Sequence, residues 1–223
     1  MTPSTLAFDI YGTLINPMAL GSSLHDLIGD KATAFNITWR DKQLEYSFRQ
    51  AVMKKFNHFS ECTRMALDYC DEYFKTNLTD QHKKNLLGLY KKLPAYDETL
   101  PCLQNLNEKG IELFAFSNGK KEDLVSLFNH AGIIKYFDKI ISVDEVNTFK
   151  PAPEVYELLL SYSNTDNQNT WLVSSNAFDI IGAGAVGVQT IWIKLNENTV
   201  FDPFDIRPTH EIANLTELTD LFN

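Results

Sequence analysis

The sequence lacks several features that would assign it to a particular class of protein. No apolar run approaches the roughly 20 residues of a membrane-spanning helix, and the first ten residues contain no basic residue, unlike a signal peptide. The chain has 3 cysteines, without CxxC spacing, so neither a disulfide framework nor a zinc site is expected. Basic residues number 20 against 29 acidic ones, with no basic block, which disfavours nucleic-acid binding. These absences predict a cytoplasmic protein that binds neither membranes nor nucleic acids.

The rest of the composition is that of a folded globular protein, and strand-like runs alternate with helix-like segments. Five short apolar runs without polar alternation predict strands that are buried on both faces. They cover residues 6–10, 113–116, 140–143, 171–173 and 190–193. Helical patterns lie around these runs, at residues 100–109, 122–131, 153–162 and 178–186. This order predicts an α/β fold with a doubly wound parallel sheet.

The first predicted strand is followed by a long stretch that contains no good strand. Between Leu14 and Pro94 the pattern predicts amphipathic helices, with Thr79 as the N-cap of the last one, at residues 20–29, 39–56, 62–76 and 80–93. We therefore expect a helical cap subdomain, residues 16–93, inserted into an α/β core domain that consists of residues 1–15 and 94–223.

Polar side chains stand at the ends of four predicted strands. From the first strand to the fourth they are Asp9, Ser117 with Asn118, Lys150, and Ser174 with Asn176 and Asp179. In open α/β sheets ligands bind outside the carboxyl ends of the strands, where a carboxylate is well placed as a nucleophile or base. Each segment alone could be only a turn, a helix cap or a solvated lysine. Four such segments at one edge of a sheet predict an active site.

These segments resemble the motifs of the haloacid dehalogenase superfamily, and within it those of the L-2-haloacid dehalogenase group. The group's patterns are D-x-Y-G-T-L, W-R-x-K-Q-L-E-Y, S-N-G, K-P…Y and S-S-N-A-W-D. They match this chain at residues 9–14, 39–46, 117–119, 150–156 and 174–179. The resemblance covers nearly the whole chain and implies a haloacid dehalogenase-like core with an inserted cap.

The resemblance implies hydrolysis of small L-2-haloalkanoic acids to 2-hydroxy acids. Asp9 would attack C2, displace halide with inversion and form an aspartyl ester, which water then cleaves. Asp179 would help to activate that water, and Ser174 with Asn176 would orient it. Lys150 would hold both carboxylates, and Arg40 would receive the halide. Thr13 and Tyr156 would orient Asp9 and Lys150.

The resemblance also implies how the substrate is bound. Ser117 and the backbone amides near Ile10, Tyr11 and Asn118 would hold its carboxylate, and Asn118 would help Arg40 with the halide. Phe59 would form part of an apolar wall around the halogen. Phe178 and Tyr156 complete the expected substrate-binding set. Two residues depart from the family pattern: Phe178 replaces a tryptophan, which would resize the pocket, and His58 replaces an aspartate.

The residue at position 11 separates this chain from the phosphatases of the same superfamily. Those enzymes need a carboxylate there, next to a Mg²⁺ ligand, whereas this chain has Tyr11 and has Asp179 without an adjacent second acid. Because Mg²⁺ prefers several hard oxygen ligands, we expect no metal and no cofactor. The alternatives are a phosphatase acting on a small phosphate ester and a non-catalytic protein that binds an organic anion. The family is often dimeric, so a homodimer is compatible with the resemblance.

A G-x-G-x-x-G pattern at residues 182–187 suggests a different function. In a dinucleotide-binding fold this pattern begins in the turn directly after a strand. Here residues 176–181 intervene, so the glycines fall along a helix. We expect them to let that helix pack closely, without binding a nucleotide.

Overall fold

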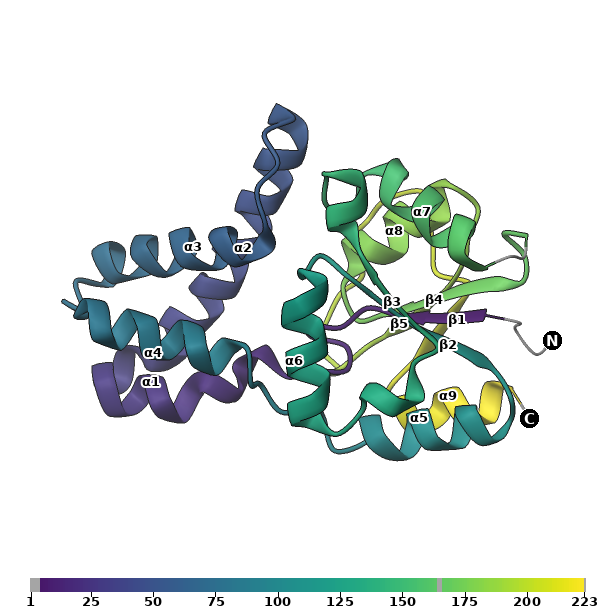
Figure 1. Cartoon of the computed structure of the whole chain (residues 1–223), viewed down its shortest axis with the longest axis horizontal. Helices are drawn as coiled ribbons and strands as arrows, with labels where there is room; N and C mark the ends of the chain where they lie inside the picture. The colour runs from purple at the N-terminus through teal and green to yellow at the C-terminus, as the bar shows by residue number, and fades with distance from the viewer. Residues whose placement is uncertain (1–4, 164–165, 223) are drawn as a thin grey trace.

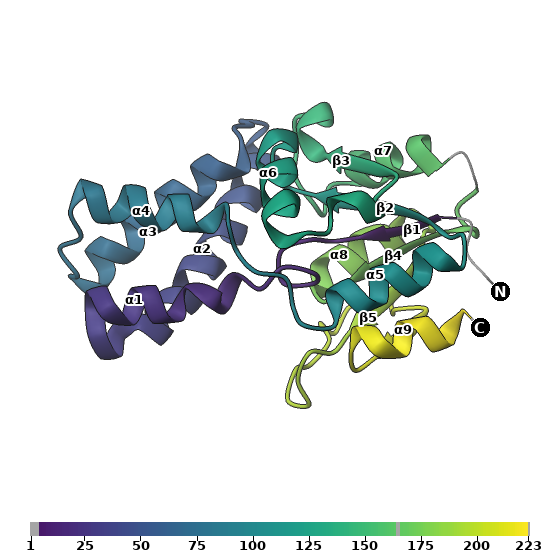
Figure 2. The ribbon, with the colours of Figure 1, turned by 60° about the horizontal axis from the view of Figure 1, so that its bottom comes forward.

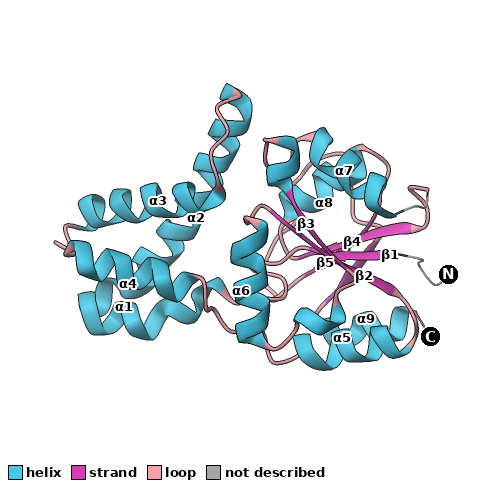
Figure 3. Ribbon diagram, viewed as in Figure 1, coloured by secondary structure: helices cyan, strands magenta, loops and turns pink. Residues whose placement is uncertain are grey.

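The computed structural model describes residues 5–163 and 166–222, and its centre is a parallel six-stranded sheet with the strand order β3-β2-β1-β4-β5-β6 (Figures 1 and 3). Its strands are β1 (Thr5–Phe8), β2 (Glu112–Ser117), β3 (Lys139–Ser142), β4 (Thr170–Ser174), β5 (Gln189–Ile193) and β6 (His210–Ile212). The order reverses between β1 and β4, where the carboxyl ends of neighbouring strands open a crevice for ligands. The sheet confirms the predicted α/β class.

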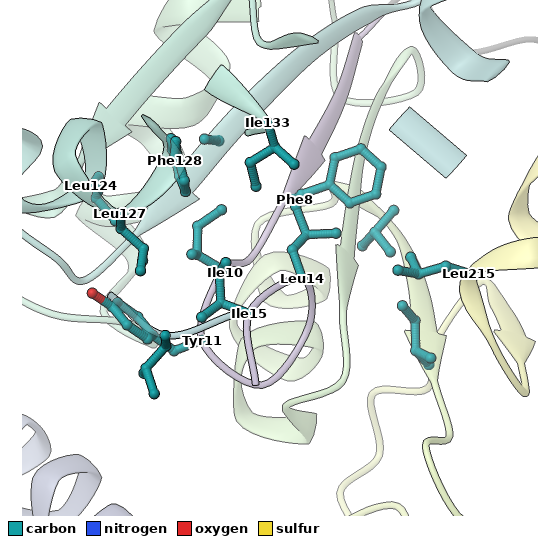
Figure 4. Close-up of a cluster of buried hydrophobic side chains, with 14 of the residues drawn as sticks. Phe8, Ile10, Tyr11, Leu14, Ile15, Leu124, Leu127, Phe128, Ile133 and Leu215 are labelled. Atoms are coloured by element: carbon teal, nitrogen blue, oxygen red, sulfur yellow. The ribbon is translucent and has the colours of Figure 1, made fainter. Parts of the chain in front are cut away.

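Helices cover both faces of this sheet, and each face has its own hydrophobic core. One layer contains α5 (Thr99–Glu108), α6 (Lys121–Ala131) and α9 (Leu215–Leu221), and the other α7 (Pro153–Ser163) and α8 (Ala177–Ala185). In β1, Phe8 packs into the first core (Figure 4). Leu6 packs into the same core, whereas Ala7 packs into the second. Burial on both faces explains why the strands show no polar alternation.

Four helices between β1 and α5 form a separate lobe, which lies beyond the carboxyl ends of the strands (Figures 1 and 2). They are α1 (Gly21–Ile28), α2 (Ala32–Met53), α3 (Phe59–Phe74) and α4 (Asp80–Tyr90). As predicted, the Thr79 side chain caps α4, accepting a hydrogen bond from the backbone N–H of His82. The two connections to the sheet lie side by side, since Asn16 N–H donates to Pro94 O and Tyr96 N–H to Leu14 O, both at 3.0 Å.

The structure corrects the sequence-based account of the elements in three places. Helix α2 begins at Ala32, seven residues before the predicted start at residue 39, because Phe35 and Asn36 are buried one turn before Trp39. The three-residue strand β6 and the short helix α9 were not predicted. Short 3-10 helices occur at Pro17–Leu20, Gly29–Lys31, Ile134–Tyr136 and Val143–Val146.

Within the described residues, no helix is long and apolar enough to cross a membrane.

Two glycines of the G-x-G-x-x-G pattern serve helix packing, as predicted, whereas Gly187 lies in the turn beyond α8 with a φ of 83°. Gly182 and Gly184 lie within α8, not in the turn after β4. A Cβ atom at Gly182 would lie 2.5 Å from the Tyr156 hydroxyl, and one at Gly184 would lie 2.6 Å from Ile206 Cγ2. Both contacts are too close for any side chain, so glycine is required for α8 to pack against α7 and the loop that carries Ile206.

Candidate active site

Asp9 follows β1 at the crevice, and its carboxylate is fixed by four side chains. Oδ2 accepts hydrogen bonds from Thr13 Oγ1 at 2.9 Å, Asn176 Nδ2 at 2.7 Å and Ser174 Oγ at 3.3 Å, while Oδ1 lies 3.0 Å from Lys150 Nζ. Asp9 is 7% exposed and lines a small pocket. A carboxylate held in one orientation at a pocket wall is arranged for nucleophilic attack.

Lys150 joins the two carboxylates of the site. Its Nζ lies 3.0 Å from Asp9 Oδ1 and 2.7 Å from Asp179 Oδ2, and it donates to Phe116 O at 2.9 Å. The residue is 1% exposed. Three acceptors for three ammonium protons satisfy this buried cation.

Asp179 lies beneath the pocket, with both oxygens already hydrogen-bonded. Oδ2 faces Lys150, and Oδ1 accepts from the Tyr156 hydroxyl at 2.8 Å. Burial, together with the charge of Asp9, raises the pKa of Asp179 to about 6 against the opposing effects of Lys150 and Tyr156. Burial likewise raises the pKa of Tyr156 well above its usual range, so its hydroxyl stays a donor. Asp179 is therefore a carboxylate that can accept a proton near neutral pH.

The opposite wall of the pocket is built at the end of β2. Ser117 Oγ accepts from the N–H of Gly119 at 3.1 Å, and Asn118 Oδ1 accepts from the N–H of Lys150 at 3.0 Å. The second bond turns the Nδ2 group of Asn118 away from Lys150. Ser117 and Asn118 both line the pocket, so this wall offers polar donors to an anion.

The cap lobe contributes a cation and apolar side chains to the same pocket. Arg40, on α2, donates from Nη2 to the carbonyl oxygen of Tyr11 at 3.1 Å and so reaches from the cap to the sheet. Leu44 and Phe59 line the pocket beside it. The Tyr11 ring stacks on Tyr90 at 5.6 Å, and burial raises the pKa of Tyr11. The lining thus combines donors, one guanidinium and an apolar wall.

The structure brings together most of the residues expected at the substrate. The pocket is lined by Asp9, Tyr11, Arg40, Leu44, Phe59, Ser117, Asn118, Lys150, Asn176 and Phe178. Leu44 was missed, although its position one helical turn after Arg40 is a signal that could have identified it. Thr13 and Ser174 lie behind the lining, where they contact Asp9 directly.

One expected substrate contact needs correction. The Tyr156 side chain is fully buried and contacts Asp179, not the substrate pocket and not Lys150. Its ring packs in the core between the sheet and α7, which motif position alone does not reveal. The Ile10 side chain is also buried in the hydrophobic core (Figure 4), so only the backbone at this position is available to a substrate.

The two departures from the family pattern have clear places in the structure. His58 precedes α3, and its Nδ1 lies 2.8 Å from Asp144 Oδ2, so it joins the cap to the segment after β3. Phe178, at the start of α8, meets Phe48 of α2 in an edge-on contact with ring centroids 5.1 Å apart. Both substituted residues therefore contact an element of the opposite lobe.

The residues around Asp9 do not fit the Mg²⁺ site of superfamily phosphatases. Tyr11 offers a phenol where a carboxylate would be needed, and Asp179 has no adjacent second acid, since Ser174, Ser175 and Asn176 are neutral. Because Mg²⁺ prefers several hard oxygen ligands, these residues supply too few carboxylates for the ion.

Comparisons with known proteins agree with this geometry. A model of the haloacid dehalogenase-like hydrolase family matches residues 3–187. The chain is 32% identical to (S)-2-haloacid dehalogenase 2 of Pseudomonas sp. strain CBS-3 over 218 residues, 98% of this chain and 95% of that one. It is 34% identical to (S)-2-haloacid dehalogenase 1 of the same strain, with 96% and 94% covered.

A solved structure is similar over nearly the whole length of both chains. It is an L-2-haloacid dehalogenase from Xanthobacter autotrophicus with chloropropionic acid covalently bound. Its TM-score to this chain is 0.89 at 26% sequence identity, and the match covers 99% of this chain and 98% of that chain. Together with the family model and the full-length relatives above 30% identity, this similarity shows that the chain belongs to the haloacid dehalogenase-like hydrolases, within the L-2-haloacid dehalogenase group.

Proposed function

We propose that the protein is an (S)-2-haloacid dehalogenase, a hydrolase that converts small L-2-haloalkanoic acids to 2-hydroxy acids through an aspartyl ester on Asp9. The observation that carries this proposal is the buried chain Asp9–Lys150–Asp179 beside a pocket that Arg40 enters from the cap. Relatives at 32% and 34% identity are named (S)-2-haloacid dehalogenases. The covalently bound chloropropionic acid of the Xanthobacter structure supports a covalent intermediate.

In the first half-reaction a carboxylate oxygen of Asp9 forms a bond to C2 of the substrate, and the carbon–halogen bond breaks. The halide leaves with the bonding electron pair, opposite the attacking oxygen, so the configuration at C2 inverts. Ser117, Asn118 and the backbone N–H groups of Ile10 and Tyr11 hold the substrate carboxylate. Arg40, helped by Asn118, stabilises the charge that develops on the halogen, and Phe59 keeps water from it.

In the second half-reaction water attacks the carboxyl carbon of the Asp9 ester, and the bond from that carbon to the substrate oxygen breaks. Esterification removes the charge of Asp9, so Asp179 remains as the carboxylate beside Lys150. We assign to Asp179 the acceptance of the water's proton, because burial, the largest cause of its raised pKa, is unchanged when Asp9 is esterified. Ser174 and Asn176 orient the water, and Thr13 with Lys150 holds Asp9. The released alkoxide takes up a proton to give the hydroxy acid.

Halide release from separate enantiomers of 2-chloropropionate, measured with EDTA present, tests this function. We expect chloride release from the L enantiomer, D-lactate as the product, and no loss of rate when EDTA is added. The chiral product is separated by chromatography. Racemic or retained product contradicts the single displacement, and a rate abolished by EDTA and restored by Mg²⁺ contradicts a metal-free site.

Arg40→Ala should lower the turnover of L-2-chloropropionate by about 10²–10³, because it removes one stabilising group from the leaving halide. Circular dichroism should show an unchanged fold. Arg64→Ala is the matched control, because Arg64 pairs with Glu61 and Asp68 on the exposed side of α3 and should keep full activity. Turnover like that of the wild type in Arg40→Ala would remove this residue from the site.

Activity should fall as the pH drops below about 6, because protonation of Asp179 removes its ion pair with Lys150 and its capacity to accept a proton. At pH 5 the rate should be roughly tenfold below its plateau. Tyr156→Phe removes a hydrogen bond that lowers the Asp179 pKa, so the inflection should move to higher pH. Tyr162→Phe, which loses only a bond to Glu145, should leave the profile unchanged. A flat profile from pH 5 to 7 in the wild type would contradict this role.

The domain division is also part of the proposal: a cap of residues 16–93 and a core of residues 1–15 and 94–223, of which residues 1–4, 164–165 and 223 lie outside the described part. The adjacent connections between the lobes support it.

The free thiols of Cys62, Cys70 and Cys102 support a cytoplasmic location. A homodimer finds support in the exposed Met53 and Tyr73 on cap helices, and light scattering would measure its mass.

A further inference from the structure

A larger, mostly apolar groove adjoins the pocket around Asp9 and shares the Phe178 side chain with it. The groove has a volume of about 640 Å³, and its walls include Phe48, Ala51 and Val52 of α2 together with Pro151 and Ala152 beside the catalytic Lys150. Phe178 lines both the groove and the pocket. Phe178 therefore stands between the two cavities, and a molecule that extends from the pocket would reach the groove at this side chain.

One face of α2 forms a wall that runs through both cavities. Arg40 and Leu44 line the inner pocket, and Phe48 and Ala51 line the groove. At 3.6 residues per turn these four positions fall on one side of the helix. The lining thus passes from the cation that faces the halide to apolar side chains at the outside.

We propose that this groove binds the alkyl chain of the substrate, and that Phe178 is the specificity residue at its inner end. The substrates would be unbranched L-2-haloalkanoic acids longer than propionate. The inference rests on the proposed function, because it takes the reacting carbon to be at Asp9.

The lining of the inner pocket determines the direction of this chain. The Ser117 and Asn118 wall is assigned to the substrate carboxylate, and Arg40 with Phe59 to the halogen. Phe178 lines both the pocket and the groove, and Leu44 lies one helical turn before Phe48, which lines the groove. A longer alkyl chain at C2 would therefore extend past Phe178 into the groove.

Phe178 is suited to control this passage. Its ring is half-buried and packs edge-on against Phe48, without a polar atom that would tie it to the backbone. The family pattern has the larger tryptophan at this position. A tryptophan there would fill more of the space between α8 and α2 than the phenylalanine ring does, and this is where the chain must pass.

Chain-length specificity tests the proposal. With L-2-chloro acids from propionate to octanoate, kcat/KM of the wild type should rise by roughly fourfold per methylene that enters the groove. Phe178→Trp and Ala51→Trp should each lower the ratio of octanoate to propionate kcat/KM at least tenfold, the first by narrowing the passage and the second by filling the groove. Val52→Trp, at a position that is 85% exposed, provides a second filling variant that cannot disturb the core.

Ile37→Trp is the matched control, because it adds the same side chain to an exposed position of α2 outside both cavities, and the ratio should not change. A ratio that both filling variants leave unchanged overturns the proposal. The proposal is also overturned if the filling variants change the molecular mass of the protein in solution but keep the chain-length preference. The groove would then be a subunit interface.

Binding of unreactive alkanoates separates this inference from the proposed function. Calorimetric titration with propionate, hexanoate and octanoate should show affinity that rises with chain length in the wild type and loses that rise in Ala51→Trp. If no haloacid releases halide, the proposed function fails while this titration still tests the groove. Equal affinity for propionate and octanoate overturns the groove proposal even when chloropropionate is hydrolysed.

Discussion

Lys150→Met should abolish dehalogenation and destabilise the protein by about 3–5 kcal/mol, because it leaves two buried carboxylates without their shared cation. Lys150 Nζ lies within hydrogen-bonding distance of both Asp9 and Asp179, and the lysine is 1% exposed, so water cannot replace the lost charge. Denaturant unfolding measures the stability, and chloride release from L-2-chloropropionate measures the activity.

Two further variants separate the loss of charge balance from the loss of a catalytic group. Lys150→Met combined with Asp179→Asn removes one charge of each sign, so it should recover part of the stability but no activity. Lys120→Met removes an exposed lysine that lies 3.6 Å from Glu122, and it should change stability by less than about 1 kcal/mol. If Lys150→Met were as stable as the wild type, the three groups would not form the ion-paired chain Asp9–Lys150–Asp179 described above.

The strand ends explain why much of the site could be predicted from sequence. Asp9, Ser117 and Lys150 each follow a buried apolar run, and parallel strands place all such ends at one edge of the sheet. Their types and order, together with the motifs around Arg40 and Asp179, then indicate the family. The cap was predictable in outline because its helices have amphipathic periodicity and a clear N-cap at Thr79.

The remaining features depend on contacts between segments far apart in sequence. The hydrogen bond from Tyr156 to Asp179 requires α7 and α8 to pack closely, which the absence of a side chain at Gly182 permits. No local pattern reveals that distance. The contact between Phe178 and Phe48 likewise depends on where the cap lies over the sheet. Strand β6 has three residues and α9 is short, so neither carries enough periodicity to be recognised.

A single turnover in H₂¹⁸O, with enzyme in excess over L-2-chloropropionate, should give unlabelled lactate and place one ¹⁸O atom in the Asp9 carboxylate. The reason is that the new hydroxyl oxygen comes from Asp9, and water replaces it when the ester is cleaved at its carboxyl carbon. The proximity of Ser174, Asn176 and Thr13 to Asp9 Oδ2 holds the carboxylate in place for this exchange of oxygens. Mass spectrometry of lactate and of the peptide containing Asp9 measures both labels.

The alternative mechanism gives the opposite distribution of label. If a carboxylate of the site acted as a general base and water attacked C2 directly, the first lactate would carry ¹⁸O and Asp9 would carry none. Enzyme incubated with lactate in H₂¹⁸O is the control, and it should show no label in Asp9. Asp9→Asn would stop both routes and so cannot separate them, whereas the isotope does. Label in the lactate of the first turnover would therefore exclude the aspartyl ester, because every oxygen that Asp9 transfers in that turnover was present before the labelled water was added.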